Sequence, residues 1–267
     1  MVRNVRAATL ETRPERIVAV GNSYPAGHKH PIHRHRRNQL LYASTGVMVV
    51  GTEQGTWVVP PQRAIWIPGG VEHEIRMIGD VCTRSVYLKD GAIAKAPNRC
   101  QVLGVSPLLS RLLMEAVDLP VAYEADDRAN HIMRLILLGL RSSVELPLCV
   151  PIPTHARLAS KRRRSLAKPN SRDTIDDWAV ALHMSRRAFV RLFRQETGTS
   201  PSAWRQQAIV VVALSRLLSG EMVTAVAIDY GSSNSGAFSS MFDRVTGATP
   251  TDYLALNEGT LDTLSRR

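Results

Sequence analysis

The sequence predicts an α+β protein of two domains, an N-terminal β-barrel followed by helices and a C-terminal all-α domain holding a double helix-turn-helix. Three observations support this fold class: strand-like runs before residue 90, helical apolar spacing from about residue 105, and a duplicated stretch after residue 185. A chain of 267 residues has room for two domains of ordinary size. The expected boundaries are 1–92 for the barrel, 93–153 for a helical segment and Pro-rich linker, 154–258 for the repeated domain and 259–267 for a polar tail.

Short apolar or alternating runs follow one another between residues 15 and 90. Turn signals made of Gly, Pro, Asn and Asp separate them at a spacing typical of a sandwich or barrel. The expected strands are Ile17–Val20, Leu40–Ala43, Gly46–Val50, Thr56–Val59, Ala64–Ile67, Glu74–Met77 and Ser85–Leu88. The interior of a small barrel can hold one small molecule. The aromatic residues Tyr42, Trp57, Trp66 and Tyr87 are candidates to line such a pocket, and the alternative is that they are plain core.

Histidine and glutamine gather in this region in two groups. The first is His33-x-His35 followed by Gln39, and the second is Pro68-x-Gly70-x-x-His73. Alternate residues of a strand share one face, so His33 and His35 are expected to point the same way. Two further histidines, His28 and His30, fall in an expected loop and are expected to be solvated.

These two groups resemble the two motifs of cupin domains, in the same order, over most of residues 25–88. The resemblance implies a small barrel in which histidines and a carboxylate hold a metal ion. The matching positions are His33, His35, Gln39 and His73. Gln39 replaces the usual Glu and removes the anionic ligand, but three imidazoles can still hold Zn, Ni, Cu or Fe. The alternative is a metal-free barrel whose pocket holds only a small-molecule effector.

From about residue 105 to 146 the apolar spacing becomes helical. One amphipathic segment contains Leu108, Leu109, Leu112, Leu113 and Ala116, and a second contains Ile132, Leu135, Ile136, Gly139 and Leu140. These helices either cover the open side of the barrel or pack against a second copy in a homodimer. Pro147–Pro153 contains three prolines, which predicts a stiff, extended linker.

The last part of the chain contains a repeat. The first copy is SRRAFVRLFRQETGTSPSAW at Ser185–Trp204, and the second is NSGAFSSMFDRVTGATPTDY at Asn234–Tyr253, an offset of 49 residues. Apolar residues at i, i+3 and i+4 predict an amphipathic helix in each copy. The residue that opens each copy is an expected N-cap, and Gly198 and Gly247 stand where a C-terminal cap belongs. A repeat this regular indicates one supersecondary unit used twice.

A shorter helix is expected upstream of each of these helices, at Ile175–Leu182 and Val223–Tyr230. Two helices joined by a tight turn form a helix-turn-helix. In the first copy, the polar face of the second helix carries the arginines Arg186, Arg187, Arg191 and Arg194. Forked arginine side chains suit guanine edges and phosphates, which predicts contact with DNA. The alternative is a pair of helical hairpins with solvated charges.

The spacing of these anchors resembles the double helix-turn-helix of the AraC/XylS family of bacterial transcription regulators, over about the last hundred residues. The shared pattern reads A-x-x-x-H-M-S-x-x-x-F-x-x-x-F-x-x-x-x-G-x-x-P-x-x-W and then A-F-x-x-x-F-x-x-x-x-G-x-x-P-x-x-Y. The resemblance implies that each second helix enters a major groove. The DNA-contacting positions implied for this chain are Ser185, Arg186, Arg187, Val190, Arg191 and Arg194 in the first copy and Ser235, Gly236, Ser239 and Ser240 in the second.

Three local features refine this prediction. His183 stands where the family usually has Gly, and because His tolerates a left-handed backbone we expect the turn to persist. The second recognition helix carries neither Arg nor Lys on its expected groove face, so the first copy is expected to dominate base readout. The basic run Lys161–Arg164 is expected on a helix where Arg163 and Arg164 contact phosphates.

Composition narrows the class of partner and the compartment. A net charge of +11 and a pI of about 10.2 favour a polyanionic partner. Three cysteines without paired spacing predict a reducing cytosol. We expect a cytoplasmic protein with no membrane partner, because neither a signal-peptide pattern nor an apolar stretch of membrane-spanning length is present.

The predicted function is that of a sequence-specific transcription regulator and not of an enzyme. Its expected partners are double-stranded promoter DNA, an unknown small-molecule effector in the cupin-like barrel, a second copy in a homodimer, and RNA polymerase. The competing class is a metal-dependent cupin enzyme, an oxygenase or isomerase, with an appended DNA-binding domain. A third class is a protein that coats DNA without sequence preference.

Overall fold

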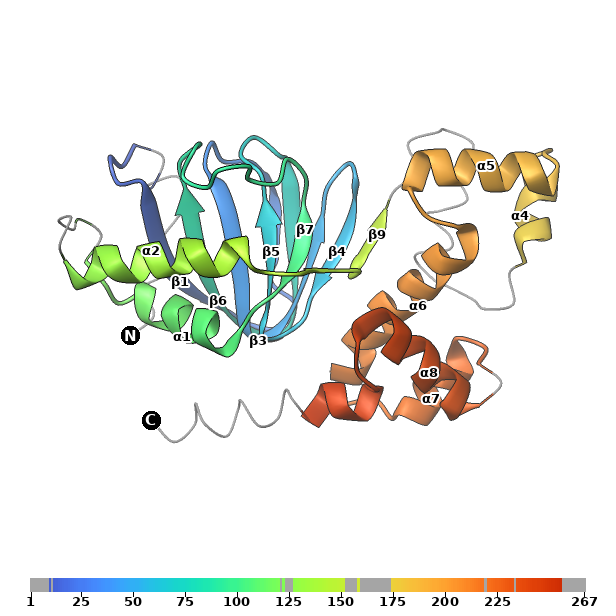
Figure 1. Cartoon of the computed structure of the whole chain (residues 1–267). Coiled ribbons are helices and arrows are strands. Elements are labelled where there is room, and N and C mark those ends of the chain that lie inside the picture. The colour runs from blue at the N-terminus through green and yellow to red at the C-terminus, as the bar shows by residue number, and fades with distance from the viewer. Residues whose placement is uncertain are drawn as a thin grey trace. The chain divides into compact units, whose positions relative to one another are not determined.

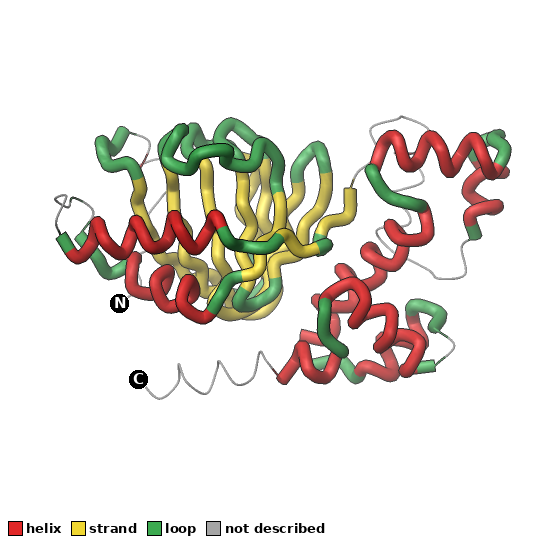
Figure 2. Tube along the Cα trace, in the orientation of Figure 1, coloured by secondary structure: helices red, strands yellow, loops and turns green. Residues whose placement is uncertain are grey.

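The computed structural model of the chain describes Leu10, residues 12–120, residue 122, residues 127–151, Leu158, and residues 174–218, 220–232 and 234–255. It divides into two compact units (Figure 1). The first comprises Met1–Thr52 and Trp57–Leu146, and the second comprises Glu53–Thr56 and Pro147–Arg267. The predicted α+β fold class is confirmed, because strands dominate the first unit and helices the second (Figure 2).

The described strands form one nine-stranded sheet in which the paired strands of the central path are antiparallel. Their order is β1-β6-β3-β5-β7-β8, with β2 added to β6, and with β4 paired to both β3 and β9. The strands are β1 (Ile17–Tyr24), β2 (Lys29–His33), β3 (Asn38–Gly51), β4 (Gly55–Val59), β5 (Arg63–Ile67), β6 (His73–Leu88), β7 (Gln101–Gly104), β8 (Glu145–Leu146) and β9 (Cys149–Pro151).

Two of these strands are longer than predicted. Each of β3 and β6 joins two runs that the sequence separated at a glycine, and the register between them shifts at Ala43–Val47. Gly46 lies in this irregularity with φ 66°, and a Cβ there would lie 2.6 Å from the carbonyl oxygen of Asp80. Only glycine therefore fits, and it produces a bulge inside the strand rather than a turn that ends it.

Two helices cover one face of the sheet in the first unit. Helices α1 (Pro107–Ala116) and α2 (Arg128–Arg141) lie along one face of it (Figure 1). They share one hydrophobic core with Leu40 and Tyr42 of β3 and Val86 of β6. The Tyr42 hydroxyl lies 2.7 Å from the Ser110 Oγ of α1. The helices therefore cover one face of the sheet, but it is not the open side of the barrel that was expected, because the cavity described below opens on the other face.

The second unit contains the predicted pair of helix-turn-helix copies. The first copy consists of α4 (Ile175–Ala181) and α5 (Arg186–Thr197), and the second of α7 (Val223–Asp229) and α8 (Ser235–Thr246), with α6 (Pro201–Leu218) between them. Ser185 and Asn234 cap α5 and α8 by accepting hydrogen bonds from the backbone N–H three residues later. Gly198 and Gly247 end these helices with a left-handed backbone, as predicted.

The two copies are not identical in their turns. His183 has φ 54° and Gly231 has φ 73°, so the left-handed turn predicted at His183 is confirmed. These residues lie 48 positions apart, as do the starts of α4 and α7, whereas the caps Ser185 and Asn234 lie 49 apart. The second turn is therefore one residue longer than the first.

Aromatic packing holds the first copy together. Trp178 of α4 contacts Phe193 and Trp204, with ring centroids 6.2 and 5.9 Å away. The Trp204 indole N–H donates to the carbonyl oxygen of Pro151, 2.7 Å away, in β9. The Pro-rich segment predicted as a linker thus supplies a strand and a contact for α6, and its last residues, 152 and 153, lie outside the described part.

None of the described helices is both long enough and apolar enough to cross a lipid bilayer. The basic run containing Arg163 and Arg164 and the tail after residue 258 also fall outside the described residues.

Candidate ligand cavity and nucleic-acid interface

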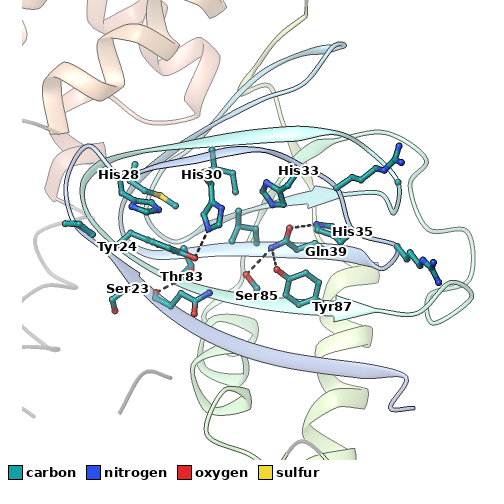
Figure 3. Close-up of a pocket in the computed structure, with 18 of the residues that line it drawn as sticks. Ser23, Tyr24, His28, His30, His33, His35, Gln39, Thr83, Ser85 and Tyr87 are labelled. Carbon is teal, nitrogen blue, oxygen red and sulfur yellow. Dashed lines mark hydrogen bonds between the residues drawn. The ribbon is translucent and has the colours of Figure 1, made fainter. Parts of the chain in front are cut away.

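A cavity of about 1160 Å³ lies in the first unit (Figure 3). The residues of β3 and β6 that line it, among them Gln39, Leu41 and Ser85, alternate with those packed beneath the helices. The cavity therefore opens on the opposite face of the sheet from α1 and α2. Figure 3 shows His28, His30, His33 and Gln39 together around this space.

The histidine side chains form a continuous row of rings. The Tyr24 ring stacks on His28 at 4.9 Å between centroids, and the His33 ring lies 5.1 Å from His30 and 4.3 Å from His73. His33 is opposite His73 in the pairing of β2 with β6, which explains their closeness. His28 lies in a loop and is partly exposed, as expected, whereas His30 belongs to β2 and not to a loop; both line the cavity.

His33 and His35 do not share a strand, since β2 ends at His33 and His35 lies in the following loop. Both nevertheless line the cavity. Three histidines are fixed by a backbone carbonyl two residues away: Nδ1 of His33 by Pro31 at 2.8 Å, Nδ1 of His35 by Arg37 at 2.6 Å, and Nδ1 of His73 by Val71 at 2.9 Å. Such bonds fix the ring orientation and direct each Nε2 away from its carbonyl.

His73 is the most deeply buried of these rings, at 1% exposure. Its Nε2 has no hydrogen-bond partner among the described residues. Burial lowers the pKa of His73 to about 4, the bond to the Val71 carbonyl opposes this change, and repulsion by neighbouring imidazoles adds to it. The ring is therefore neutral at physiological pH, with one nitrogen available.

Gln39 is the centre of a buried polar network. Its Oε1 lies 2.9 Å from His35 Nε2, and its Nε2 donates to Ser85 Oγ at 3.2 Å and to the Tyr87 hydroxyl at 2.9 Å. Both nitrogens of the His35 ring thus face oxygen atoms. Either this imidazole carries two protons, or the amide is reversed so that its NH₂ donates to His35 and its oxygen accepts from both hydroxyls.

The four residues implied as metal ligands are neighbours, but their arrangement differs from a metal site. Among the described residues, no group of three or more His, Cys, Asp or Glu side chains is placed to hold a metal ion. His35 directs its Nε2 at the Gln39 oxygen, so this nitrogen is already engaged. This arrangement does not test the metal assignment, which stays a prediction.

Of the four aromatic residues expected in the pocket, Tyr87 lines the cavity. Tyr42 and Trp66 belong instead to the core shared with the helices, and Trp57 is buried at 4% exposure without lining the cavity. Those three assignments are corrected, because alternation places neighbouring strand residues on opposite faces. The cavity residues Thr83 and Ser85 were missed, although two polar residues at alternate positions before Tyr87 were a signal for them.

The candidate nucleic-acid interface is the exposed side of α5. Arg187, Arg191 and Arg194 are exposed, and Val190 is half-buried. Arg186 is also exposed, and its Nη1 lies 2.9 Å from an Asp176 carboxylate oxygen. This exposed ion pair is weak, so Arg186 can exchange it for a phosphate or base.

The corresponding side of α8 is nearly uncharged. Ser235, Gly236 and Ser240 are exposed and Ser239 is half-buried, so all four predicted positions reach the surface at least in part. The sequence reasoning missed Arg216 of α6, which pairs with Glu221 at 2.5 Å and with Asp229 at 2.6 Å and lies over the Tyr230 ring. The pair with Asp229 joins α6 to α7, and the pair with Glu221 joins α6 to the segment that precedes α7.

Two family models match the chain. The one described as an AraC-like ligand binding domain covers residues 18–146, and the one described as a helix-turn-helix domain covers residues 178–255.

The chain is also similar to two curated relatives and to a solved structure. The HTH-type transcriptional regulator NimR of Escherichia coli K12 is 31% identical over 84% of this chain and 82% of its own length. The RCS-specific HTH-type transcriptional activator RclR of the same organism is 32% identical over 37% of this chain and 35% of its own. The structure of ToxT from Vibrio cholerae is 9% identical, with a TM-score of 0.37, over 90% of this chain and 98% of that chain.

Proposed function

The chain belongs to the AraC/XylS family of transcription regulators, and from that premise we propose that a small molecule bound in the cavity controls the binding of the helix-turn-helix pair to promoter DNA. The protein is a transcription regulator with an N-terminal ligand-binding domain and a DNA-binding domain, and not an enzyme. The observation that carries the proposal is the cavity of about 1160 Å³ inside the region that matches the ligand-binding domain. A cavity of this size suits a drug-sized ligand.

We propose that the effector contacts the protein side chains directly, without a metal ion. The hydrogen bond between Gln39 and His35 supports this proposal, because it engages a nitrogen that a metal would need. Elemental mass spectrometry of untagged protein tests it, with the His33→Ala/His73→Ala variant as control. Near-stoichiometric metal that disappears in the variant would replace direct binding with metal-assisted binding.

In the DNA-binding domain, the first copy reads bases and the second adds weaker or shape-based contacts. The exposed arginines of α5 and the serine-rich face of α8 support this division. Arginine forks recognise guanine in the major groove, whereas serine hydroxyls discriminate less between bases.

A homodimer forms through the outer faces of the two helices that cover the sheet. Leu108 of α1 is 66% exposed, and Leu135 and Leu138 of α2 are 44% and 57% exposed. Apolar side chains gathered on one surface mark an interaction site, and a second copy is the partner that this chain always has available. Light scattering on the purified protein gives the oligomeric state, and a Leu138→Lys variant should shift it towards the monomer.

The central test is selection of binding sites from a library of random duplexes by the full-length protein. A regulator enriches one sequence and binds it tighter than random duplex at matched salt. Equal affinity for enriched and random DNA would reject sequence-specific regulation in favour of non-specific coating.

A further inference from the structure

The lining of the cavity is one-sided in charge. Among the described residues that line it, none is Asp or Glu. It contains instead four histidines and two arginines: His28, His30, His33, His35, Arg34 and Arg36. Arg34 also pairs with the exposed carboxylate of Glu72, with 3.6 Å between Nη1 and Oε1. From the described lining residues, a ligand inside the cavity therefore meets arginines and neutral donors, and no carboxylate.

The donors of the cavity wall are also numerous. The Tyr24 hydroxyl lies 3.4 Å from His30 Nε2, and the Ser85 and Tyr87 hydroxyls line the space near Gln39. Each hydroxyl or imidazole N–H can donate to an oxyanion, and donors directed at an anion make the stronger hydrogen bonds.

The histidine rings lie close together: the His30 ring centroid is 5.6 Å from that of His28 and 5.1 Å from that of His33. Their N–H groups are hydrogen-bond donors, so an oxyanion placed among the rings can accept bonds that a cation cannot.

The remaining wall is apolar. Leu41, Ile75 and Met77 line the cavity together with the ring faces of Tyr24 and Tyr87. This surface can bury a hydrocarbon or flat unsaturated body.

We propose that the cavity selects a small organic anion, a carboxylate or a group of similar charge and shape, whose apolar body packs against Leu41, Ile75 and Met77. This inference rests on the proposed function and names the chemical class of its effector. The imidazoles and the arginines hold the charged end, and the apolar wall holds the remainder.

Charge-matched probes test this selectivity on the full-length protein. One set is benzoate, benzamide and benzylamine, and another is hexanoate, hexanamide and hexylamine, so that the body is constant within a set and only the charge changes. Titration followed by NMR should show the acid binding at least tenfold tighter than the amide in one set or both, with the amine weakest. Equal or tighter binding of an amide or amine, or no binding of any acid at millimolar concentration, overturns the proposal.

A nearly isosteric variant places a negative charge in the wall. Asn22 is half-buried and lines the cavity, so Asn22→Asp should weaken binding of the preferred acid at least tenfold. Asn130→Asp is the matched control, because Asn130 is also half-buried but lies on α2, away from the cavity. Ser23→Asp repeats the test at an exposed lining residue, with folding checked by circular dichroism. Unchanged affinity in both lining variants contradicts the proposal.

Failure of this inference is distinguishable from failure of the proposed function. If a neutral probe binds and alters affinity for the selected duplex, the regulator assignment stands and anion selectivity is wrong. If an acid binds with the expected preference but leaves DNA affinity unchanged, anion selectivity stands and effector control of DNA binding is wrong.

Discussion

Replacing Gln39 with leucine should destabilise the sheet of the ligand-binding domain by about 2–4 kcal/mol. Gln39 is 4% exposed and makes contacts with His35, Ser85 and Tyr87. A net hydrogen bond contributes ~1 kcal/mol, and a buried polar group left without a partner costs ~1–3 kcal/mol. Leucine has a similar volume, so packing changes little. Water in the cavity can partly replace the lost amide at Ser85 and Tyr87. The expected loss of stability is therefore smaller than the summed contributions of the three hydrogen bonds.

Hydrogen exchange measured by mass spectrometry is the suitable assay, because a two-domain protein does not unfold in a single step. Peptides covering β3 and β6 should exchange roughly 30- to 1000-fold faster, since each ~1.4 kcal/mol corresponds to a factor of ten. Peptides covering α5 and α8 should be unchanged. The control is Gln101→Leu on β7, because the Gln101 side chain makes no hydrogen bond with a described residue.

A change smaller than ~0.5 kcal/mol in Gln39→Leu would show that the network centred on Gln39 does not hold the strands. An equal loss of protection from hydrogen exchange in the Gln101→Leu control would mean that the effect comes from leucine in a strand and not from the missing hydrogen bonds.

Three further predictions concern Gln39, the arginines of α5 and the turn at His183. Gln39→Glu should fold, because the surrounding hydroxyls and the His35 imidazole can all donate to a carboxylate. Elemental analysis of the untagged variant should find bound Zn or Ni. Metal that remains after His73→Ala is added would show that the metal binds elsewhere. Arg187→Ala or Arg191→Ala should weaken the binding free energy for the selected duplex by ~1–3 kcal/mol, and that for random DNA by less. Equal losses of binding free energy on both duplexes would mean that these residues contact only phosphates. His183→Gly removes a non-glycine residue at φ 54° and should stabilise the first helix-turn-helix by ~0.5–1 kcal/mol. The stabilisation should appear as slower amide hydrogen exchange in α4. Faster exchange would mean that the His183 side chain makes a stabilising contact.

The helical domain could be predicted closely because its signals are local. A cap is decided by one side chain and the N–H groups that follow it, so Ser185 and Asn234 could be recognised without any tertiary contact. The left-handed turn at His183 could be predicted because His183 stands where the resembled family usually has Gly and because His tolerates a left-handed backbone.

The sheet was harder to predict because its decisive contacts are non-local. Strand β2 contains charged residues and Pro31, and it is a strand only because it pairs with β6. Both faces of β3 are buried, so polarity could not tell which of its residues face the cavity and which face the helices. This ambiguity led to the misplacement of Tyr42.

Strand β3 separates the two sides of the ligand-binding domain by a single layer of backbone. Gln39 and Leu41 belong to the cavity wall, while the intervening Leu40 and the following Tyr42 belong to the core beneath α1. A bound molecule that displaces this strand also displaces the surface on which α1 rests, and closely packed side chains leave no compliant layer between them. Under the proposed function, detection and transmission share one stretch of chain, and we expect substitutions in β3 that change which molecule is accepted also to change the strength of the response.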